Sequence, residues 1–310
     1  MGEAATDTPR VSVVTPAFNA AATLERAIAS ALAQAPVAVE VIVVDDCSTD
    51  DTRAVAARFA DKGVRLIAND RNLGASESRN VAIRAACGAY VAFLDSDDEW
   101  RPGKLAAQLA LAEADPGRTL IHCDGAYVNP DGAEFDRVYN HAPPVDGPEA
   151  WRALIRYCFI HTSCVLAPRE TLLALGGFDA GLVVAEDQDL WIRLALAGSV
   201  AHLPDILTVI HDLPGSLMKR EVMRERDFVL PMIAGHIAAQ RHRLTRREAR
   251  AALGGRRAQL GRRAYALGQR AAGFGYLVRA ALAGVDPWAN LTYPLRASKP
   301  ARALAAWIKG

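Results

Sequence analysis

In the stretch Tyr90-Val91-Ala92-Phe93-Leu94-Asp95-Ser96-Asp97-Asp98, an apolar run suited to a buried strand ends abruptly in carboxylates. In parallel sheets, ligands bind beyond the carboxyl ends of such strands. Asp95 and Asp97 are two residues apart, so on an extended backbone both would point the same way. Their oxygens suit Mg²⁺ or Mn²⁺, which share their remaining coordination positions with water and phosphate. The stretch predicts a metal-assisted phosphate site, and a solvated acidic turn is the alternative.

Two earlier segments have the same form, an apolar strand followed by polar residues. They are residues 11–14 before Thr15-Pro16, and residues 39–44 before Asp45-Asp46. The spacer 23–34 has apolar residues at helical spacing, and residues 48–51 suit the start of a second helix. Strands that alternate with helices predict an α/β fold with a mainly parallel sheet flanked by helices.

Right-handed crossovers would bring the ends of these strands to one edge of the sheet. We therefore expect Asp45, Asp46, Asp95 and Asp97 to converge there. Carboxylates that crowd one crevice repel one another unless a cation joins them. The pattern thus favours a divalent metal that holds a diphosphate.

An ordered set of segments covering about residues 9–215 resembles the family 2 glycosyltransferases, which are inverting enzymes of the GT-A type. The segments are residues 13–19, Val43-Val44-Asp45-Asp46-Cys47-Ser48-Thr49-Asp50, residues 69–74 with 78–80, residues 93–98, residues 100–105, Gly176-Gly177-Phe178-Asp179 and residues 186–194. The resemblance implies a GT-A-type domain that binds a nucleotide-diphosphate sugar. It also implies Mn²⁺ or Mg²⁺ as the cofactor.

The resemblance assigns nucleotide-binding roles residue by residue. Pro16, Ala17 and Phe18 would border the base, Asp45 would lie at the base or ribose, Arg71, Asn72 and Gly74 would shape the pocket, Arg79 would approach the diphosphate, and Asp95 and Ser96 would contact the nucleotide. The guanidinium fork matches phosphate oxygens. Surface ion pairs are the alternative for Arg71 and Arg79.

The resemblance makes Asp97 and Asp95 metal ligands and Asp187 the base that activates the acceptor hydroxyl. An ordinary aspartate has a pKa near ~4, so burial or the neighbouring Glu186 would need to raise the pKa of Asp187. A helix N-terminal cap is the alternative for Glu186-Asp187, and both roles can hold together. His211 resembles the histidine of a loop that reaches the metal or diphosphate, although Asp212 and Leu213 depart from the usual pattern there. His161 is more typical of a structural histidine.

Length and composition agree with one large α/β domain and an attachment. The chain has 310 residues, of which 51% are hydrophobic, and its five cysteines lack paired metal-ligand spacing. Neither a membrane-spanning run nor a signal core is expected, so we predict a cytoplasmic protein. Tyr127, Tyr139 and Trp151 are candidates for stacking on an acceptor sugar, and plain packing is their alternative.

Charge divides the chain near Lys219. Residues 1–218 contain 17 basic and 30 acidic residues, whereas residues 219–310 contain 19 basic and 5 acidic residues. We expect a flexible N-terminus over 1–10, a glycosyltransferase domain over 11–218 and a basic helical region over 219–310. Gly254-Gly255 is expected to separate two of its helices. This region would be a solvated cap or a peripheral contact with anionic lipid at the inner face of the plasma membrane; no motif supports nucleic acid binding.

The resemblance implies an inverting, metal-dependent glycosyltransferase that uses a nucleotide-diphosphate sugar, with uridine the expected base. The acceptor would be a saccharide or a lipid-linked saccharide in cell-surface polysaccharide or glycolipid synthesis. Two alternatives stay open: a non-catalytic module that binds a sugar nucleotide, and a nucleotidyltransferase. The first would be expected to lack Asp97 or Asp187, and the second normally has a Gly-rich basic loop after its first strand.

Overall fold

The computed structural model describes residues 9–211 and 225–297. Contacts divide these residues into two compact units: unit 1 is 9–154, 158–182 and 186–211, and unit 2 is 155–157, 183–185 and 225–297. Residues 1–8 and the expected domain boundary at 218 and 219 lie outside the described part of the chain. The functional division into 1–10, 11–218 and 219–310 stays a prediction.

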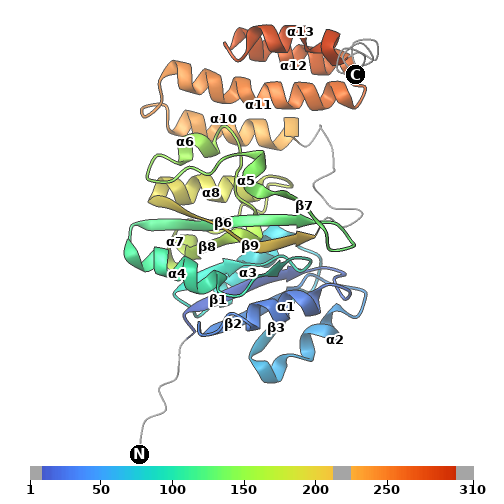
Figure 1. Ribbon diagram of the computed structural model, residues 1–310, viewed down its shortest axis with the longest axis vertical. Helices are drawn as coiled ribbons and strands as arrows, with labels where there is room; N and C mark the ends of the chain where they lie inside the picture. Colours follow the sequence, from blue (N-terminus) through green and yellow to red (C-terminus); the bar gives the residue numbers. More distant parts are fainter. Residues whose placement is uncertain (1–8, 212–224, 298–310) are drawn as a thin grey trace, which may run out of the picture. The chain divides into compact units, whose positions relative to one another are not determined.

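The first half of unit 1 is a parallel sheet, as the alternation of strands and helices predicts. Its strands lie in the order β3 (Val64–Ala68), β2 (Val39–Asp45), β1 (Val11–Ala17) and β4 (Tyr90–Phe93), and all three pairings are parallel. Strands β1, β2 and β3 are labelled in Figure 1. Strands β1, β2 and β4 are almost wholly buried, which accounts for their continuous apolar runs. Their carboxyl ends therefore meet at one edge.

The second half extends the same sheet with mixed pairings. From β4 the order continues through β8 (Val165–Pro168), β6 (Arg118–Val128), β9 (Ser199–His211) and β5 (Glu99–Trp100), while β7 (Glu134–Arg137) forms a hairpin with β6. Strand β8 is antiparallel to both of its neighbours, and β6 is parallel to β9. The sheet is thus mixed, with its parallel part where the sequence alternates strand and helix.

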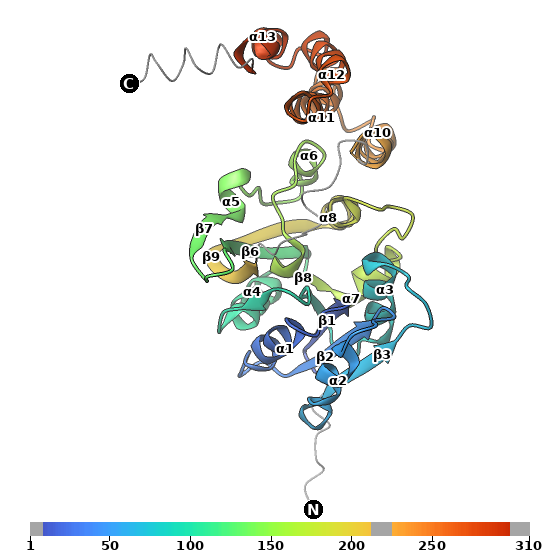
Figure 2. The ribbon, with the colours of Figure 1, turned by 90° about the vertical axis from the view of Figure 1, so that its right-hand side faces the viewer.

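Helices cover both faces of this sheet (Figure 2). Apolar residues of α1 (Leu24–Leu32), α2 (Thr52–Ala57) and α4 (Lys104–Ala114) share one core with β1 and β2. On the other face lie α3 (Ala75–Ala85) and α8 (Glu186–Ala197), whose Trp191 packs on Phe93. Shorter helices are α5 (Val138–His141), α6 (Trp151–Leu154) and α7 (Arg169–Ala174), with single turns at Ala60–Lys62 and Thr162–Cys164.

Unit 2 is helical. Its elements are a π-helical turn (Glu225–Val229), α10 (Leu230–Ala239), α11 (Arg246–Ala266), α12 (Arg270–Leu282) and α13 (Pro287–Ala297). The expected break at Gly254-Gly255 was wrong, because α11 runs through both glycines. Its capping box at Thr245 and Glu248 and its packing on α12 outweigh the low helix propensity of glycine. No helix of residues 9–211 and 225–297 is long and apolar enough to cross a bilayer.

Candidate active site

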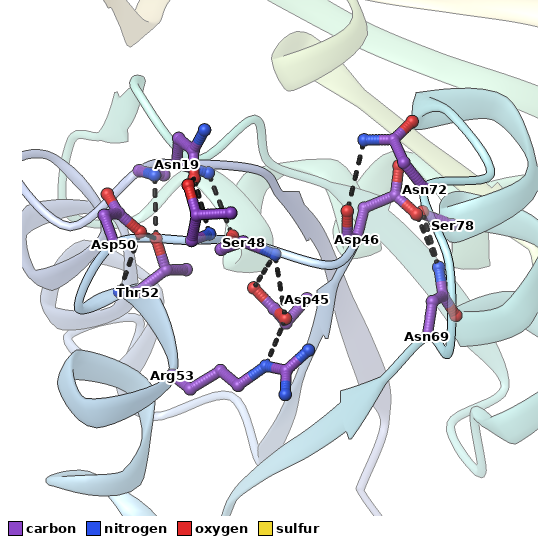
Figure 3. A network of polar contacts seen from close by, with 12 residues as sticks. Asn19, Asp45, Asp46, Ser48, Asp50, Thr52, Arg53, Asn69, Asn72 and Ser78 are labelled. Carbon is purple, nitrogen blue, oxygen red and sulfur yellow. Dashed lines mark hydrogen bonds and ion pairs between the residues drawn. The ribbon is translucent and has the colours of Figure 1, made fainter.

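The loops that follow β1 and β2 are tied together by side chains (Figure 3). The Asn19 backbone N–H donates to Ser48 Oγ at 2.9 Å, and the Thr49 N–H donates to Asn19 Oδ1 at 2.9 Å. The Ala20 N–H donates to the buried Thr52 Oγ1 at 2.8 Å. These reciprocal bonds hold the two loops as one rim at the carboxyl edge of the sheet. Phe18, on this rim, is 52% exposed.

Asp45 and Asp46 point to opposite faces of the sheet, as successive strand residues do. Asp45 faces α2, where Arg53 Nε donates to Asp45 Oδ2 at 2.5 Å. Asp46 faces α3 and accepts bonds from the backbone N–H groups of Leu73 and Gly74, both at 2.8 Å. Asn69 Nδ2 also donates to Asp46 Oδ1 at 2.8 Å. Both carboxylates are therefore fully engaged with protein groups.

The expected convergence of four aspartates on one cation is wrong. Asp45 and Asp46 have the separate partners just described, and Asp95 is paired with Arg79. No group of three or more His, Cys, Asp or Glu side chains within residues 9–211 and 225–297 lies close enough to enclose an ion. The expectation failed because it considered only that the strands end at one edge of the sheet. It did not consider that successive side chains point to opposite faces.

Arg79 joins two acidic segments that are far apart in the sequence. Its Nη2 lies 2.6 Å from Asp95 Oδ1, and its Nη1 lies 3.5 Å from Glu186 Oε1. Only 6% of Arg79 is exposed, and its guanidinium lies 5.3 Å from the Phe178 ring. Its Nε and Nη1 atoms are buried without a hydrogen-bond partner within the described residues. Buried donors of this kind normally find an acceptor, so Arg79 retains capacity for an anionic ligand.

The residues around Arg79 are fixed by a joint between α3 and the turn at Gly176-Gly177. Asn80 Nδ2 donates to the Phe178 carbonyl, and the Phe178 N–H donates to Asn80 Oδ1, both at 2.8 Å. The Phe178 ring in turn packs edge-on against Phe93, with their centroids 5.3 Å apart. Arg193 of α8 pairs with Asp189 at 2.7 Å and donates to the Gly177 carbonyl. These contacts thus connect α3, β4 and α8 next to Asp95 and Glu186.

The Asp95–Asp98 segment is a turn rather than a continuing strand, because β4 ends at Phe93 and the Asp98 N–H donates to the Asp95 carbonyl at 3.1 Å. The expectation of an extended backbone through Asp95 and Asp97 was therefore wrong. Burial raises the pKa of the Asp95 carboxyl, but Arg79 and His161 outweigh it and hold that pKa low. Burial and the charge of Asp95 raise the pKa of Asp97.

Asp97 has the chemistry of a cation ligand. His211, at the end of β9, lies near enough to lower the pKa of Asp97, and its Nε2 is 3.0 Å from Glu99 Oε1. The carboxylates of Asp97 and Asp95 and the imidazole of His211 are donor types that suit Mn²⁺ or Mg²⁺. Since Asp95 is shared with Arg79, an ion here would need phosphate and water oxygens to complete its coordination.

Asp187 has the properties expected of a general base. It lies in the first turn of α8 and accepts a bond from the Gln188 backbone N–H at 2.6 Å. Burial and the adjacent Glu186 raise its pKa to about 6, against the opposing charges of Arg79 and His161. A base whose pKa lies near neutrality combines the correct protonation state with useful basicity. Asp187 thus accepts from a backbone N–H in the first turn of α8 and carries a carboxyl group with a raised pKa.

The structure adds two residues that the sequence pattern did not single out for the site, Asp98 and Ser163, and brings His161 into it. Asp98 is buried, accepts a bond from Ser163 Oγ, and accepts another from the His211 N–H at 3.4 Å. His161 Nδ1 lies 3.8 Å from Asp98 Oδ2. Burial, Asp95 and Asp97 raise the pKa of Asp98 well above its usual range. The only signal in the sequence was the third carboxylate of the segment 95–98.

The remaining predicted nucleotide residues lie along the same edge. Ala17 is buried, Pro16 and Ser96 are half-buried, and Arg71 and Asn72 are exposed. Asn72 Nδ2 donates to the Asp46 carbonyl at 3.2 Å, while Gly74 precedes α3 with a φ of 85°. Among the aromatic candidates, Trp151 has no exposed surface and cannot stack on a sugar.

The family model described as Glycosyl transferase family 2 matches residues 12–163 of this chain. A UDP-Glc:α-D-GlcNAc-diphosphoundecaprenol β-1,3-glucosyltransferase from Escherichia coli is 30% identical over 61% of this chain and 71% of its own length. The succinoglycan biosynthesis protein ExoO of Rhizobium meliloti (strain 1021) is 53% identical over 34% of this chain. The chain spans only 30% of the length of that second relative.

Solved structures share the fold. The S. aureus TarS fragment 1–349 in complex with UDP has a TM-score of 0.64 at 21% identity, over 88% of this chain and 80% of its own. A Pyrobaculum calidifontis mannosyltransferase in complex with GDP-Man and Mn²⁺ has a TM-score of 0.57 at 24% identity, over 98% of this chain and 89% of its own. The expected GT-A-type α/β fold with C-terminal helices is confirmed.

Proposed function

The chain belongs to glycosyltransferase family 2, and from that premise we propose that it transfers a sugar with inversion from a UDP-sugar to a saccharide or lipid-linked acceptor. The observation that carries this proposal is the position of Arg79 between Asp95 and Glu186, beside Asp187. It brings a phosphate-binding cation and a raised-pKa carboxylate into one site. The related E. coli enzyme, by its name, moves glucose from UDP to a diphospholipid-linked sugar, which favours cell-surface polysaccharide or glycolipid synthesis.

We propose that the donor diphosphate lies against Arg79. Nη1 and Nε of this side chain are buried and have hydrogen-bonding capacity left over within the described residues. Phosphate oxygens match the guanidinium fork. The nucleoside would then extend along the rim that carries Pro16, Ala17, Phe18 and Asp45, with Arg71, Asn72, Gly74 and Ser96 completing the pocket.

We propose Asp187 as the base. The acceptor hydroxyl is a weak nucleophile, so Asp187 would take its proton while the oxygen attacks the anomeric carbon from the face opposite the diphosphate. Glu186 contributes by raising the pKa of Asp187. A Mn²⁺ or Mg²⁺ ion bound through Asp97, with Asp95 and His211 near it and phosphate and water oxygens as its other ligands, would neutralise charge on the leaving diphosphate. Arg79 would keep its hold on that group through the same step.

We also propose that unit 2 gives the protein a peripheral contact with anionic lipid. Residues 219–310 are strongly basic in composition. Trp288 and Leu291 share a face of α13 and are 76% and 46% exposed, and Leu282 at the end of α12 is 84% exposed. Apolar side chains with a tryptophan, in a basic segment, suit the interface of an anionic membrane.

The direct test is thermal unfolding of the protein with a panel of nucleotide sugars, with and without Mn²⁺. A ligand that binds the native state raises the unfolding temperature, so UDP-sugars should raise it and Mn²⁺ should enlarge the effect. Asp97→Ala should remove the Mn²⁺-dependent part and leave the fold intact. Unchanged Mn²⁺-dependent affinity of this variant in calorimetry would contradict its role as a ligand.

Asp187→Asn separates binding from chemistry. We expect it to bind the donor normally and to lower turnover about 100-fold or more, since a positioned base contributes at least that much. Transfer at the wild-type rate would exclude Asp187 as the base. Normal donor binding without any transfer by the wild-type protein would instead favour the non-catalytic module. Release of pyrophosphate from a nucleoside triphosphate supplied with a sugar phosphate would favour a nucleotidyltransferase.

A further inference from the structure

Three aromatic side chains gather at the end of β6, and we call them the aromatic platform: Tyr127, Phe135 and His141. The Tyr127 ring lies 6.2 Å from the Phe135 ring, tilted by 38° to it, and 5.7 Å from the His141 ring, edge-on. They come from β6, from β7 and from α5, so the β6–β7 hairpin and the helix after it assemble the group.

The aromatic platform is at the surface. Phe135 is 52% exposed, and the His141 side chain is 59% exposed. Large apolar side chains such as Trp151 and Phe159, a short distance along the chain, are fully buried. An exposed phenyl ring in contact with a tyrosine ring is more typical of a ligand surface than of a core.

The aromatic platform is held in place and has a polar border. His141 Nε2 lies 3.0 Å from Asp136 Oδ2, and Asn140 donates to the other oxygen of Asp136 at 3.0 Å. Glu134, next to Phe135, is paired with Arg101. Apolar faces with a border of carboxylate and guanidinium groups provide both stacking and hydrogen bonding at one place.

The aromatic platform adjoins the proposed base through one ring. Tyr127 lies 6.4 Å from the His161 imidazole, edge-on at 89°. Burial lowers the pKa of His161, and the charges of Asp95 and Asp187 oppose that shift, so both carboxylates lie close to this ring. Tyr127 therefore connects the exposed Phe135 ring to His161, whose imidazole is within electrostatic range of Asp187.

We propose that the aromatic platform binds the pyranose ring of the acceptor and directs one of its hydroxyl groups toward Asp187. A pyranose has an apolar face of C–H groups and a polar rim of hydroxyl groups, which matches the exposed rings and their polar border. The proposal rests on the proposed function and deepens it, because it defines the acceptor end of the site. Phe135 and Tyr127 act as positioning residues.

The test is saturation-transfer NMR on the full chain with UDP and the diamagnetic Mg²⁺ present. The probes are the methyl glycosides of β-glucose, β-galactose, α-mannose and N-acetyl-α-glucosamine. We expect at least one glycoside to receive saturation, strongest at the C–H protons of one ring face. Phe135→Ala should raise its dissociation constant about tenfold, the loss of ~1.4 kcal/mol expected for one aromatic contact.

Matched variants separate stacking from folding. Tyr127→Phe retains the ring and should bind the glycoside as the wild type does. Leu173→Ala, at an apolar residue of α7 that is 38% exposed, should change nothing. Each variant is also tested for UDP binding by thermal shift.

Two outcomes would overturn the aromatic platform as an acceptor site and leave the proposed function intact. One is that the wild type binds UDP but transfers saturation to no glycoside, and the other is that Phe135→Ala transfers as much saturation as the wild type. Loss of UDP binding by the wild type would reject both. A drop in UDP binding confined to Phe135→Ala would assign the hairpin to the donor end, which also overturns the proposal.

Discussion

Arg79 sets the ionisation of the carboxylates around it. Its charge holds Asp95 ionised in spite of burial, and that ionised group then raises the pKa of Asp97. Burial would lower the pKa of Arg79 itself, but Asp95 and Glu186 raise it further. The guanidinium also lowers the pKa of Asp187, although burial and Glu186 leave that value at about 6. One side chain thus adjusts both the donor end and the proposed base.

The pH profile of transfer tests this arrangement. Protonated Asp187 cannot accept a proton, so the rate should fall as the pH drops below about 6. Arg79→Gln removes a charge that lowers the pKa of Asp187, so the acid limb of the profile should move to higher pH. The measurement is kcat/KM against pH for each protein.

Arg84→Gln is the matched control for that substitution. Arg84 also lies on α3, but it is exposed and pairs with Glu77 at 2.6 Å. Its substitution should leave the acid limb unchanged. An acid limb at the same pH in Arg79→Gln and the wild type would show that Asp187 does not titrate under the influence of Arg79.

At the scale of elements, the joint between α3 and the Gly176-Gly177 turn decides where Arg79 lies. Both glycines have positive φ, 78° and 71°, which glycine adopts without strain. A Cβ on Gly177 would lie 2.2 Å from Asn80 Oδ1, the acceptor that fixes Phe178. A Cβ on Gly176 would meet no heavy atom within 4 Å. The two neighbours therefore separate backbone strain from steric conflict.

Gly177→Ala should destabilise the protein by about 3 kcal/mol and lower turnover, because the Asn80–Phe178 bonds must open and Arg79 loses its support. Gly176→Ala should cost about 1 kcal/mol, the strain of a left-handed alanine, and leave the kinetics unchanged. Urea unfolding and steady-state rates measure the two effects. Equal destabilisation of the two variants would mean that the contact with Asn80 carries no weight.

The sequence predicted the strands and the first helix well because their apolar period is local. It predicted α11 poorly, since the packing that keeps Gly254 and Gly255 helical involves α12. The opposite orientations of Asp45 and Asp46 could have been predicted from the sequence, because adjacent residues of an extended backbone face opposite sides of the sheet. The pairing of Arg79 with Glu186 could not have been predicted, since it depends on how α3 and α8 pack.

At the scale of the whole molecule, the two ends of the chain differ in charge. Acidic residues dominate the first 218 positions and basic residues dominate the last 92. An acidic surface is repelled by anionic lipid, whereas a basic segment is attracted over about a Debye length, roughly 10 Å at moderate salt. The charge distribution therefore favours one region of the protein for membrane contact.

Sedimentation with liposomes tests that preference. The full-length protein should pellet with phosphatidylserine-containing vesicles at low salt and be released at high salt. A Trp288→Ser/Leu291→Ser variant should partition about tenfold less, because burial of these side chains contributes to binding. Leu66→Ser, at a residue of β3 that is 36% exposed, serves as the control. Equal pelleting of the double variant and the wild type would show that these residues of α13 do not contact the membrane.

The alternation at the end of β2 restricts how relatives of this chain can vary in length. An insertion of a single amino acid within Val39–Asp45 would exchange the two carboxylates, aiming the first at Asn69 and the second at Arg53. Every apolar side chain between the insertion and Asp45 would change faces as well. The loops beyond this strand can therefore become longer in evolution. The strand itself tolerates substitutions but not a single-residue insertion, which would change the face to which its side chains point.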